Sequence, residues 1–126
     1  MIRILEGAST RVVVAEASGK VTAEDYESVL IPAVEGASAD GVKLRFLYVL
    51  GTEFEGYEGA AALDDAKMGM HFWASFDRIG LVTDHDVIAG LAKALGLLMP
   101  GEFKVFPLSE RTAAEEWVAA DMADPS

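Results

Sequence analysis

The sequence contains no cysteine, and this absence removes several kinds of chemistry at once. Disulfide bonds, thiol nucleophiles and thiolate metal sites are all excluded. Basic residues are also scarce, because 10 lysines and arginines stand against 21 acidic residues, for a formal net charge of -11. They are spread singly along the chain, so no basic cluster can neutralise a run of phosphates. Nucleic acid and anionic membrane surfaces are therefore poor partners for this protein.

Long apolar runs are missing as well, and none approaches the roughly 18 to 20 residues that span a bilayer. The first residues, Met1 to Glu6, reach an acidic residue too early for a signal peptide. We therefore expect a soluble, cytoplasmic protein without membrane insertion. Its 126 residues, 52% of them hydrophobic, fit a single domain over 1–126, with 121–126 as a frayed tail.

The first third of the chain predicts a hairpin followed by a helix. β-Branched stretches indicate strands over 2–6 and 11–17, joined by a turn. Thr22 is then a helix N-cap, and Asp25 three residues later completes a shortened capping box. Pro32 falls inside the helical pattern, where it removes a backbone donor and should kink the helix or tighten its last turn.

The rest of the chain alternates strands and helices. An almost continuous apolar run predicts a strand over 42–50 that is covered on both faces. The elements expected after it are a loop over 51–56, a helix from 57 to 74, a strand over 78–83, a helix over 86–95, a strand over 102–106 and a final helix from Ser109. Asp84 is the expected cap of the helix over 86–95, whose core face is Val87, Ile88, Leu91, Ala92 and Leu95.

This order, β-β-α-β-α-β-α-β-α, defines an α/β fold. Strands that alternate with helices indicate a mostly parallel sheet with right-handed crossovers, and the opening hairpin adds one antiparallel strand. The expected architecture is a five-stranded mixed sheet flanked by about four helices.

Several short stretches, in their order and spacing, resemble the SpoIIAA-like family of small bacterial domains related to STAS and CRAL-TRIO domains. They are Gly19, Asp25-Tyr26, Pro32, Phe54-Glu55-Gly56-Tyr57, Ala62 to Lys67, Phe76 to Asp84, Val105-Phe106 and Glu115 to Val118. The resemblance covers most of the chain and implies a five-stranded mixed sheet flanked by helices. It implies little about function, because STAS antagonists are phosphorylation-switched binding modules whereas CRAL-TRIO domains hold lipids in an apolar cleft.

One residue-level feature of the STAS antagonists can be compared directly. Their phosphorylated serine lies at the start of the helix after the third strand, and the corresponding stretch here, 52–59, contains no serine. Its hydroxyls, Thr52 and Tyr57, stand among Glu53, Glu55 and Glu58, where a phosphate would add about two further negative charges. The sequence therefore predicts that this phosphoswitch is not retained.

Two polar sets are candidates for chemistry. Asp64, Lys67 and His71 share one side of the helix over 57–74, where a histidine beside a carboxylate could move protons or weakly bind a metal. A solvated helix face with an ordinary Asp–Lys pair explains the same pattern. The second set, Asp84-His85-Asp86, follows a strand and is equally explained by helix capping. We expect no metal site and no cofactor, and the candidate residues favour a non-enzymatic protein over an enzyme.

Apolar residues are in excess between 51 and 76, where they extend beyond one helical stripe. Core packing, a second copy of the chain or an apolar ligand could each account for them. The leading hypothesis is a non-enzymatic binding or regulatory module that forms a homodimer through 51–76. The alternatives are a carrier of a small apolar or lipid-like ligand, held between the helix over 57–74 and the sheet, and an enzyme that uses Asp64 and His71. The predicted binding residues are Phe54, Tyr57, Asp64, Lys67, Met68, His71 and Phe72.

Overall fold

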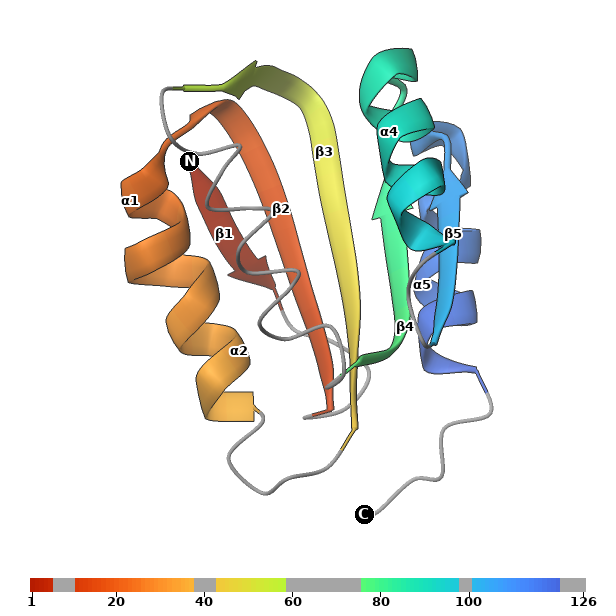
Figure 1. Ribbon diagram of the computed structural model, residues 1–126. Coiled ribbons are helices and arrows are strands. Elements are labelled where there is room, and N and C mark those ends of the chain that lie inside the picture. The colour runs from red at the N-terminus through yellow and green to blue at the C-terminus, as the bar shows by residue number, and fades with distance from the viewer. Residues whose placement is uncertain (6–10, 38–42, 59–75, 98–100, 121–126) are drawn as a thin grey trace.

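The protein is described by a computed structural model in which residues 1–5, 11–37, 43–58, 76–97 and 101–120 are placed (Figure 1). Its strands are β1 (Ile2–Leu5), β2 (Val12–Val21), β3 (Leu44–Tyr57), β4 (Phe76–Val82) and β5 (Glu102–Phe106). Its helical elements are α1 (Ala23–Asp25), η1 (Tyr26–Leu30), α2 (Ile31–Ala37), α4 (Asp86–Gly96), η3 (Leu108–Glu110) and α5 (Arg111–Ala119). The helix expected over 57–74 and the tail over 121–126 lie outside the described residues, except for Tyr57, which ends β3, and Glu58, which follows it outside any helix.

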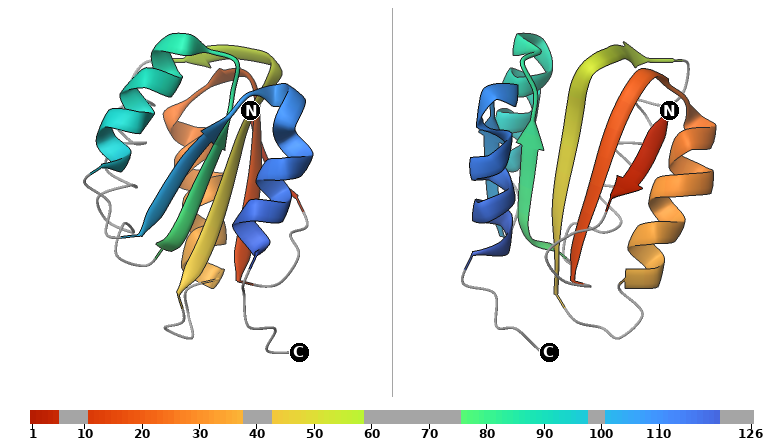
Figure 2. Two further views of the ribbon diagram at one scale, coloured as in Figure 1. Left: turned by 90° about the vertical axis from the view of Figure 1, so that its right-hand side faces the viewer. Right: turned by 180° about the vertical axis from the view of Figure 1, so that it is seen from behind.

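The five strands form one sheet in the order β1-β2-β3-β4-β5. β1 is antiparallel to β2, and every other neighbouring pair is parallel, which confirms the five-stranded, mostly parallel sheet. Each parallel connection leads to the adjacent strand, and always towards the β5 edge of the sheet. When right-handed crossovers all run in one direction along a sheet, their helices lie on the same face of it. The first helix (α1, η1 and α2) and α4 accordingly share a face, and α5 covers the other (Figure 2).

Two hydrophobic clusters lie on the two faces of the sheet. Alternate side chains of the strands pack with Tyr26, Leu30 and Val34 of the first helix in one cluster, and with Ala114 and Val118 of α5 in the other. The stretch of β3 from 44 to 50 is buried at every position. The prediction of a strand covered on both faces is therefore confirmed, and burial of its apolar surface is a main source of stability.

The first helix begins where the sequence predicts and contains a π turn just before Pro32. Thr22 and Asp25 form the reciprocal capping box, with Asp25 N donating to Thr22 Oγ1 at 3.2 Å and Thr22 N donating to Asp25 Oδ2 at 2.8 Å. The next residues, Tyr26–Leu30, form one π turn, in which the Ile31 N–H donates to the Tyr26 carbonyl. Pro32 follows at once and has no N–H to offer, so the distortion lies at the proline.

The expected end of β3 and the expected core face of α4 are both wrong. The loop expected over 51–56 is strand, because β3 runs on to Tyr57 beside a β2 that itself extends to Val21. In α4, Val87 and Leu91 were expected in the core but are 67% and 63% exposed. Ile88 and Ala92, one residue further along, pack against the core instead.

The helix α5 is fixed to the sheet by its C-terminal end. Arg45 donates to the carbonyls of Val118 and Ala120, and Arg78 donates to the Trp117 carbonyl at 2.7 Å. Cationic groups are favourable at the negative end of a helix dipole, so these contacts are favourable both as hydrogen bonds and electrostatically.

Glu16 ties three elements together. It accepts hydrogen bonds from Arg3 of β1, with Nη2–Oε1 2.5 Å, and from Arg111 of α5, with Nη1–Oε2 2.8 Å. The hydrogen bonds from Arg3 and Arg111 lower the pKa of Glu16 below its ordinary value of 4.5, although partial burial opposes them. The carboxylate form is thus favoured by folding.

The effect of Glu16 on stability should depend on pH. Since its pKa is lower in the folded than in the unfolded chain, its contribution is present above about pH 4.5 and is lost as pH falls through the lowered value. We expect Glu16→Gln to lower the free energy of unfolding by up to about 1 kcal/mol at neutral pH, with a smaller loss in acid. Urea titrations at several pH values measure this. Glu115→Gln, on the longer 3.8 Å pair with Arg111, is the control. An equal loss at pH 3 and pH 7 would contradict the account.

Gly80 on β4 makes room for Trp117 of α5. A Cβ atom there would lie 2.9 Å from Leu47 Cδ1 and 3.5 Å from Trp117 Cζ3. We expect Gly80→Val to destabilise the fold by about 1–3 kcal/mol, because both neighbours must move within a packed layer. Gly90→Ala is the matched control, since Gly90 lies in α4 with nothing within 4 Å of its Cβ position. It should raise stability by about 0.5–1 kcal/mol through helix propensity. Thermal unfolding of both variants tests the contrast.

Candidate binding surface at the carboxyl end of β2 and β3

Two of the seven predicted binding residues, Phe54 and Tyr57, lie in the described part of the chain. Both are on the outer half of β3, beyond the point where the sequence predicted the strand to end. The other five, Asp64, Lys67, Met68, His71 and Phe72, lie outside the described residues, and their grouping stays a prediction.

Phe54 and Tyr57 serve as anchors of the strand end. Their rings meet edge to face with centroids 5.5 Å apart, and Tyr57 stacks on Tyr26 of the first helix at 6.4 Å. Both side chains are half-buried against the helix-side core. Aromatic pairs of this geometry add stability beyond the area they bury. The two residues therefore hold the outer half of β3 against the first helix, while the polar side chains of that part of β3 face solvent.

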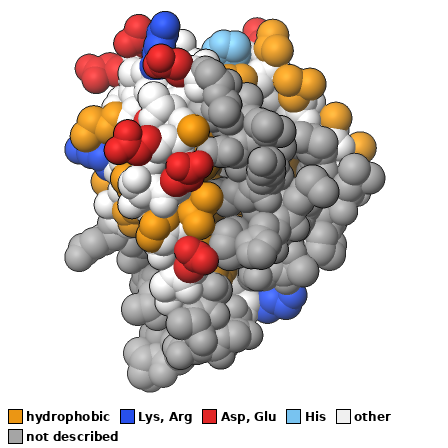
Figure 3. Space-filling view, turned by 60° about the vertical axis from the view of Figure 1, so that its left-hand side comes forward, with side chains coloured by type: hydrophobic (Ala, Val, Ile, Leu, Met, Phe, Trp, Pro, Cys, Tyr) orange, Lys and Arg blue, Asp and Glu red, His pale blue; other side chains and the backbone are white. Residues whose placement is uncertain are grey.

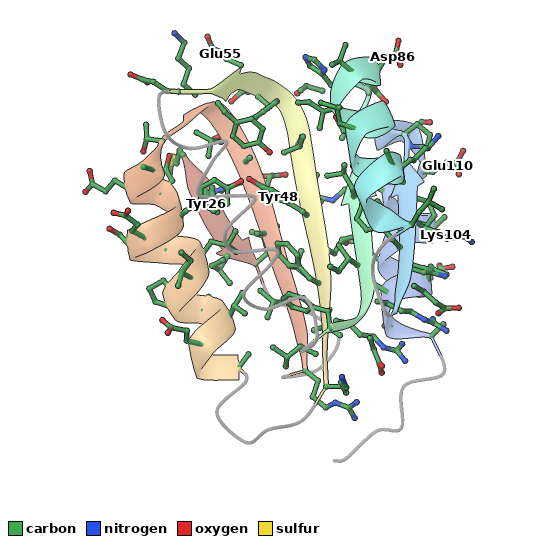
Figure 4. The ribbon with its side chains drawn as sticks, viewed as in Figure 1. Tyr26, Tyr48, Glu55, Asp86, Lys104 and Glu110 are labelled. Carbon is green, nitrogen blue, oxygen red and sulfur yellow. The ribbon has the colours of Figure 1, made fainter. Side chains whose placement is uncertain are left out.

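Tyr26 continues this aromatic row into the core. Its hydroxyl lies 2.9 Å from the hydroxyl of Tyr48, and both residues are buried between the first helix and the sheet (Figure 4). Tyr48 in turn stacks on Phe46 at 5.6 Å. Sequence analysis missed this pair, because Tyr48 lies within a continuous apolar run. Buried hydroxyls that bond each other fix the relative position of helix and strand.

A β-bulge in β3, opposite Gly19 of β2, shapes the surface beside this anchor. The pairing of β2 with β3 shifts register on both sides of Gly19, whose φ of 59° is in the left-handed region that favours glycine. The bulge lets both strands continue together, with Gly19 opposite Phe54 and Val21 opposite Tyr57. An open hollow of about 670 Å³ lies here, lined by Met1, Ser18, Gly19, Lys20, Thr52, Glu53 and Glu55.

The backbone amine of Met1 closes one side of the hollow. It donates to the carbonyls of Ser18 at 2.8 Å and Lys20 at 3.0 Å, and it lies 3.2 Å from Asp25 Oδ2. Burial acts to raise the pKa of Asp25, but hydrogen bonds from Thr22 and the Met1 amine outweigh it and lower that pKa. Asp25 therefore remains a carboxylate that joins β1, the bulge and the helix start.

The outer half of β3 has an open edge. β4 pairs with β3 only as far as Val49, opposite Val82, and no described strand pairs with β3 on that side from residue 50 to 57. In Figure 1 this end of β3 curves over β2, away from β4 and α4. Unpaired main-chain groups along a strand are a template for another extended segment.

Acidic side chains dominate this end of the molecule. Glu53, Glu55 and Glu58 are exposed along or just after the outer half of β3, and the start of the neighbouring first helix exposes Glu24 and Glu27. Figure 3 shows several acidic side chains on one face of the molecule, and Figure 4 shows Glu55 by the end of β3. Lys20 is the exposed basic side chain among the residues that line the hollow, which the Met1 amine also borders. The surface therefore favours a positively charged partner.

The second polar set, Asp84-His85-Asp86, has a structural role. Asp84 Oδ1 accepts a hydrogen bond from Leu108 N at 2.9 Å, which joins the end of β4 to η3. The His85 carbonyl accepts the first bond of α4, from Ala89 N, so His85 rather than Asp84 precedes the helix. Within the placed segments, no group of three or more His, Asp or Glu residues could hold a metal ion. No helix of these segments is long and apolar enough to cross a membrane.

Comparison with known proteins agrees with this architecture. The family described as SpoIIAA-like matches residues 12–119, so the chain belongs to the SpoIIAA-like family. The chain is similar to a crystal structure of an uncharacterized protein from Shewanella loihica PV-4, of the DUF3478 family with a SpoIIAA-like fold. The two share 28% identity and a TM-score of 0.75, over 94% of this chain and 92% of that one. Among curated proteins, none matches this chain.

Proposed function

We propose that this chain is a non-enzymatic binding module, and that its working surface is the bulged outer half of β3 with the adjoining end of β2. The observation that carries the proposal is the overhang of β3. The strand runs to Tyr57 while its pairing with β4 ends at Val49. An overhang held by aromatic anchors offers a rigid, extended main chain to a partner.

The charges on this surface indicate what kind of partner fits. Glu53 and Glu55 are both exposed on the outer half of the strand, within the stretch where β3 carries extra residues relative to β2. A second copy docked here would set these carboxylates against their equivalents, in a chain that already carries -11. Like charges opposite one another in a sheet are destabilising. We therefore assign the surface to an extended segment with lysine or arginine at alternate positions, and place self-association elsewhere.

The other two hypotheses depend on residues outside the placed segments. The carrier hypothesis needs an apolar cleft beside the helix expected over 57–74. The hollow formed by described residues is open to solvent, and its lining is polar and apolar in about equal parts. The enzyme hypothesis needs Asp64 and His71. Both stay predictions of the sequence, and the open acidic edge of β3 favours the binding module over them.

Designed peptides test the proposed surface directly. An octapeptide of alternating valine and lysine should shift the amide resonances of residues 52–57 in NMR titrations, and bind roughly tenfold more tightly than a valine–glutamate octapeptide. The double variant Glu53→Lys/Glu55→Lys should reverse that preference. Its matched control is Glu24→Lys/Glu27→Lys, which makes the same charge change on the first helix and should keep the original preference.

Two results would overturn the proposal. One is an equal response to both peptides. The other is a set of shifts that leaves 52–57 unperturbed and lies on another face.

A further inference from the structure

Besides the overhang of β3, the sheet has two outer strands, β1 and β5. They differ in the charges that a second copy of the chain would meet if it paired with them. β1 ends the sheet on one side and β5 on the other. In Figure 2 the outer edge of β5 is visible between α4 and α5, with neither helix across it. No described strand pairs with that edge. An uncovered strand edge is the usual starting point of pairing between chains.

The direction of the main-chain groups on β5 follows from one hydrogen bond. Thr83 N donates to the Phe106 carbonyl at 2.9 Å, so the peptide groups of Phe106 face β4. Residues alternate along a strand, and the N–H and C=O of Phe103 and Val105 therefore face outward. Antiparallel pairing of two copies must set outward-facing residues opposite one another. This leaves only a few registers open to β5.

Charge selects one of these registers. With Phe103 opposite Phe103 of the second copy, Glu102 lies opposite Lys104 on both sides of the two-fold axis. A shift of the register in one direction sets Lys104 against itself, and a shift in the other direction sets Glu102 against itself. Opposite charges across a strand pair stabilise it and like charges destabilise it. The strand is thus self-complementary in a single register.

The contacts already made within one chain extend this pattern across the sheet. Arg78 of β4 is opposite Glu102 in the parallel register, and its Nε lies 2.6 Å from Glu102 Oε2. Lys104 projects on the same face, with its Nζ 5.5 Å from the centre of the Trp117 ring (Figure 4). Pairing through β5 would therefore form the row Arg78, Glu102 and Lys104 of the second copy, in which charges alternate.

The other two open edges lack this self-complementarity. On β1, Met1 and Ser18 exchange hydrogen bonds, so Ile2 and Ile4 face outward. The register with full overlap then sets Arg3 against itself. The overhang of β3 carries Glu53 and Glu55. Among the described edges, β5 is the one on which pairing with a second copy sets opposite charges, Glu102 and Lys104, against each other.

We propose that two copies of this chain pair antiparallel through β5 and so form a continuous ten-stranded sheet. The contact uses short strands, and we expect it to bury less than the roughly 1,600 Å² of a standard interface, so the dimer is weak. The proposal does not depend on the function assigned to the β3 overhang, because that surface lies towards the other side of the sheet.

Charge reversal at the two positions tests the pairing. Sedimentation equilibrium from roughly 10 μM to 1 mM should show a monomer–dimer equilibrium for the unaltered chain. Glu102→Lys and Lys104→Glu should each weaken association about tenfold, because both reciprocal pairs become repulsive. The double variant should recover it. An equimolar mixture of the two single variants should associate at least as well as the original, because each lysine then meets a glutamate.

Each outcome of this experiment is decisive. A chain that stays monomeric to 1 mM overturns the proposal, and so does a dimer that none of the variants weakens. Glu102→Lys also breaks the pair with Arg78, so a thermal melt first checks its fold. If it does not fold, Lys104→Glu and Lys104→Gln decide alone. Charge reversal must then weaken the dimer more than neutralisation does.

Discussion

The parallel pairing of β2 with β3 is the interaction on which the rest of this structure depends. It runs from Val12 opposite Arg45 to Val21 opposite Tyr57, and it survives a bulge of β3 opposite Gly19. The first part buries the centre of both hydrophobic clusters. The second part positions Thr22 to begin the first helix, forms the hollow beside the Met1 amine and carries β3 beyond β4. Core, helix start and candidate surface thus share one ladder of main-chain hydrogen bonds.

The order of the strands explains why the candidate surface is an overhang and not a crevice. In open α/β sheets, ligands bind at the point where the strand order reverses and neighbouring crossovers lie on opposite faces. Here the order β1-β2-β3-β4-β5 never reverses, so the sheet has no such point. Its accessible main chain lies instead where β3 extends beyond β4 and along the outer strands of the sheet. These edges differ in charge, because the overhang of β3 is acidic whereas β5 carries both Glu102 and Lys104.

The sequence predicted the elements whose signals are local or strongly apolar. The run over 44–50, the capping box of Thr22 and Asp25 and the disturbance at Pro32 all appear as expected. The outer half of β3 was missed, since Gly51, Gly56 and two acidic residues have the composition of a loop. That stretch is strand because β2 lies beside it, which is a tertiary effect. Val87 and Leu91 were misplaced for a related reason: both fit a helical stripe, and only packing decides which side of α4 faces the sheet. Of the predicted binding residues, Phe54 and Tyr57 are on the candidate surface, but as its anchors, and the exposed glutamates between and beside them carry its charge.

Amide hydrogen exchange along residues 53–58 tests the central claim most directly. Glu58 N donates to the Val21 carbonyl at 2.8 Å, and Gly56 is opposite Lys20 in the same ladder. The account predicts slow exchange at both amides, because the ladder with β2 continues as far as Val21 opposite Tyr57. Fast exchange at Gly56 and Glu58, as fast as in an unstructured loop, would show that β3 ends near Leu50 and would contradict the account.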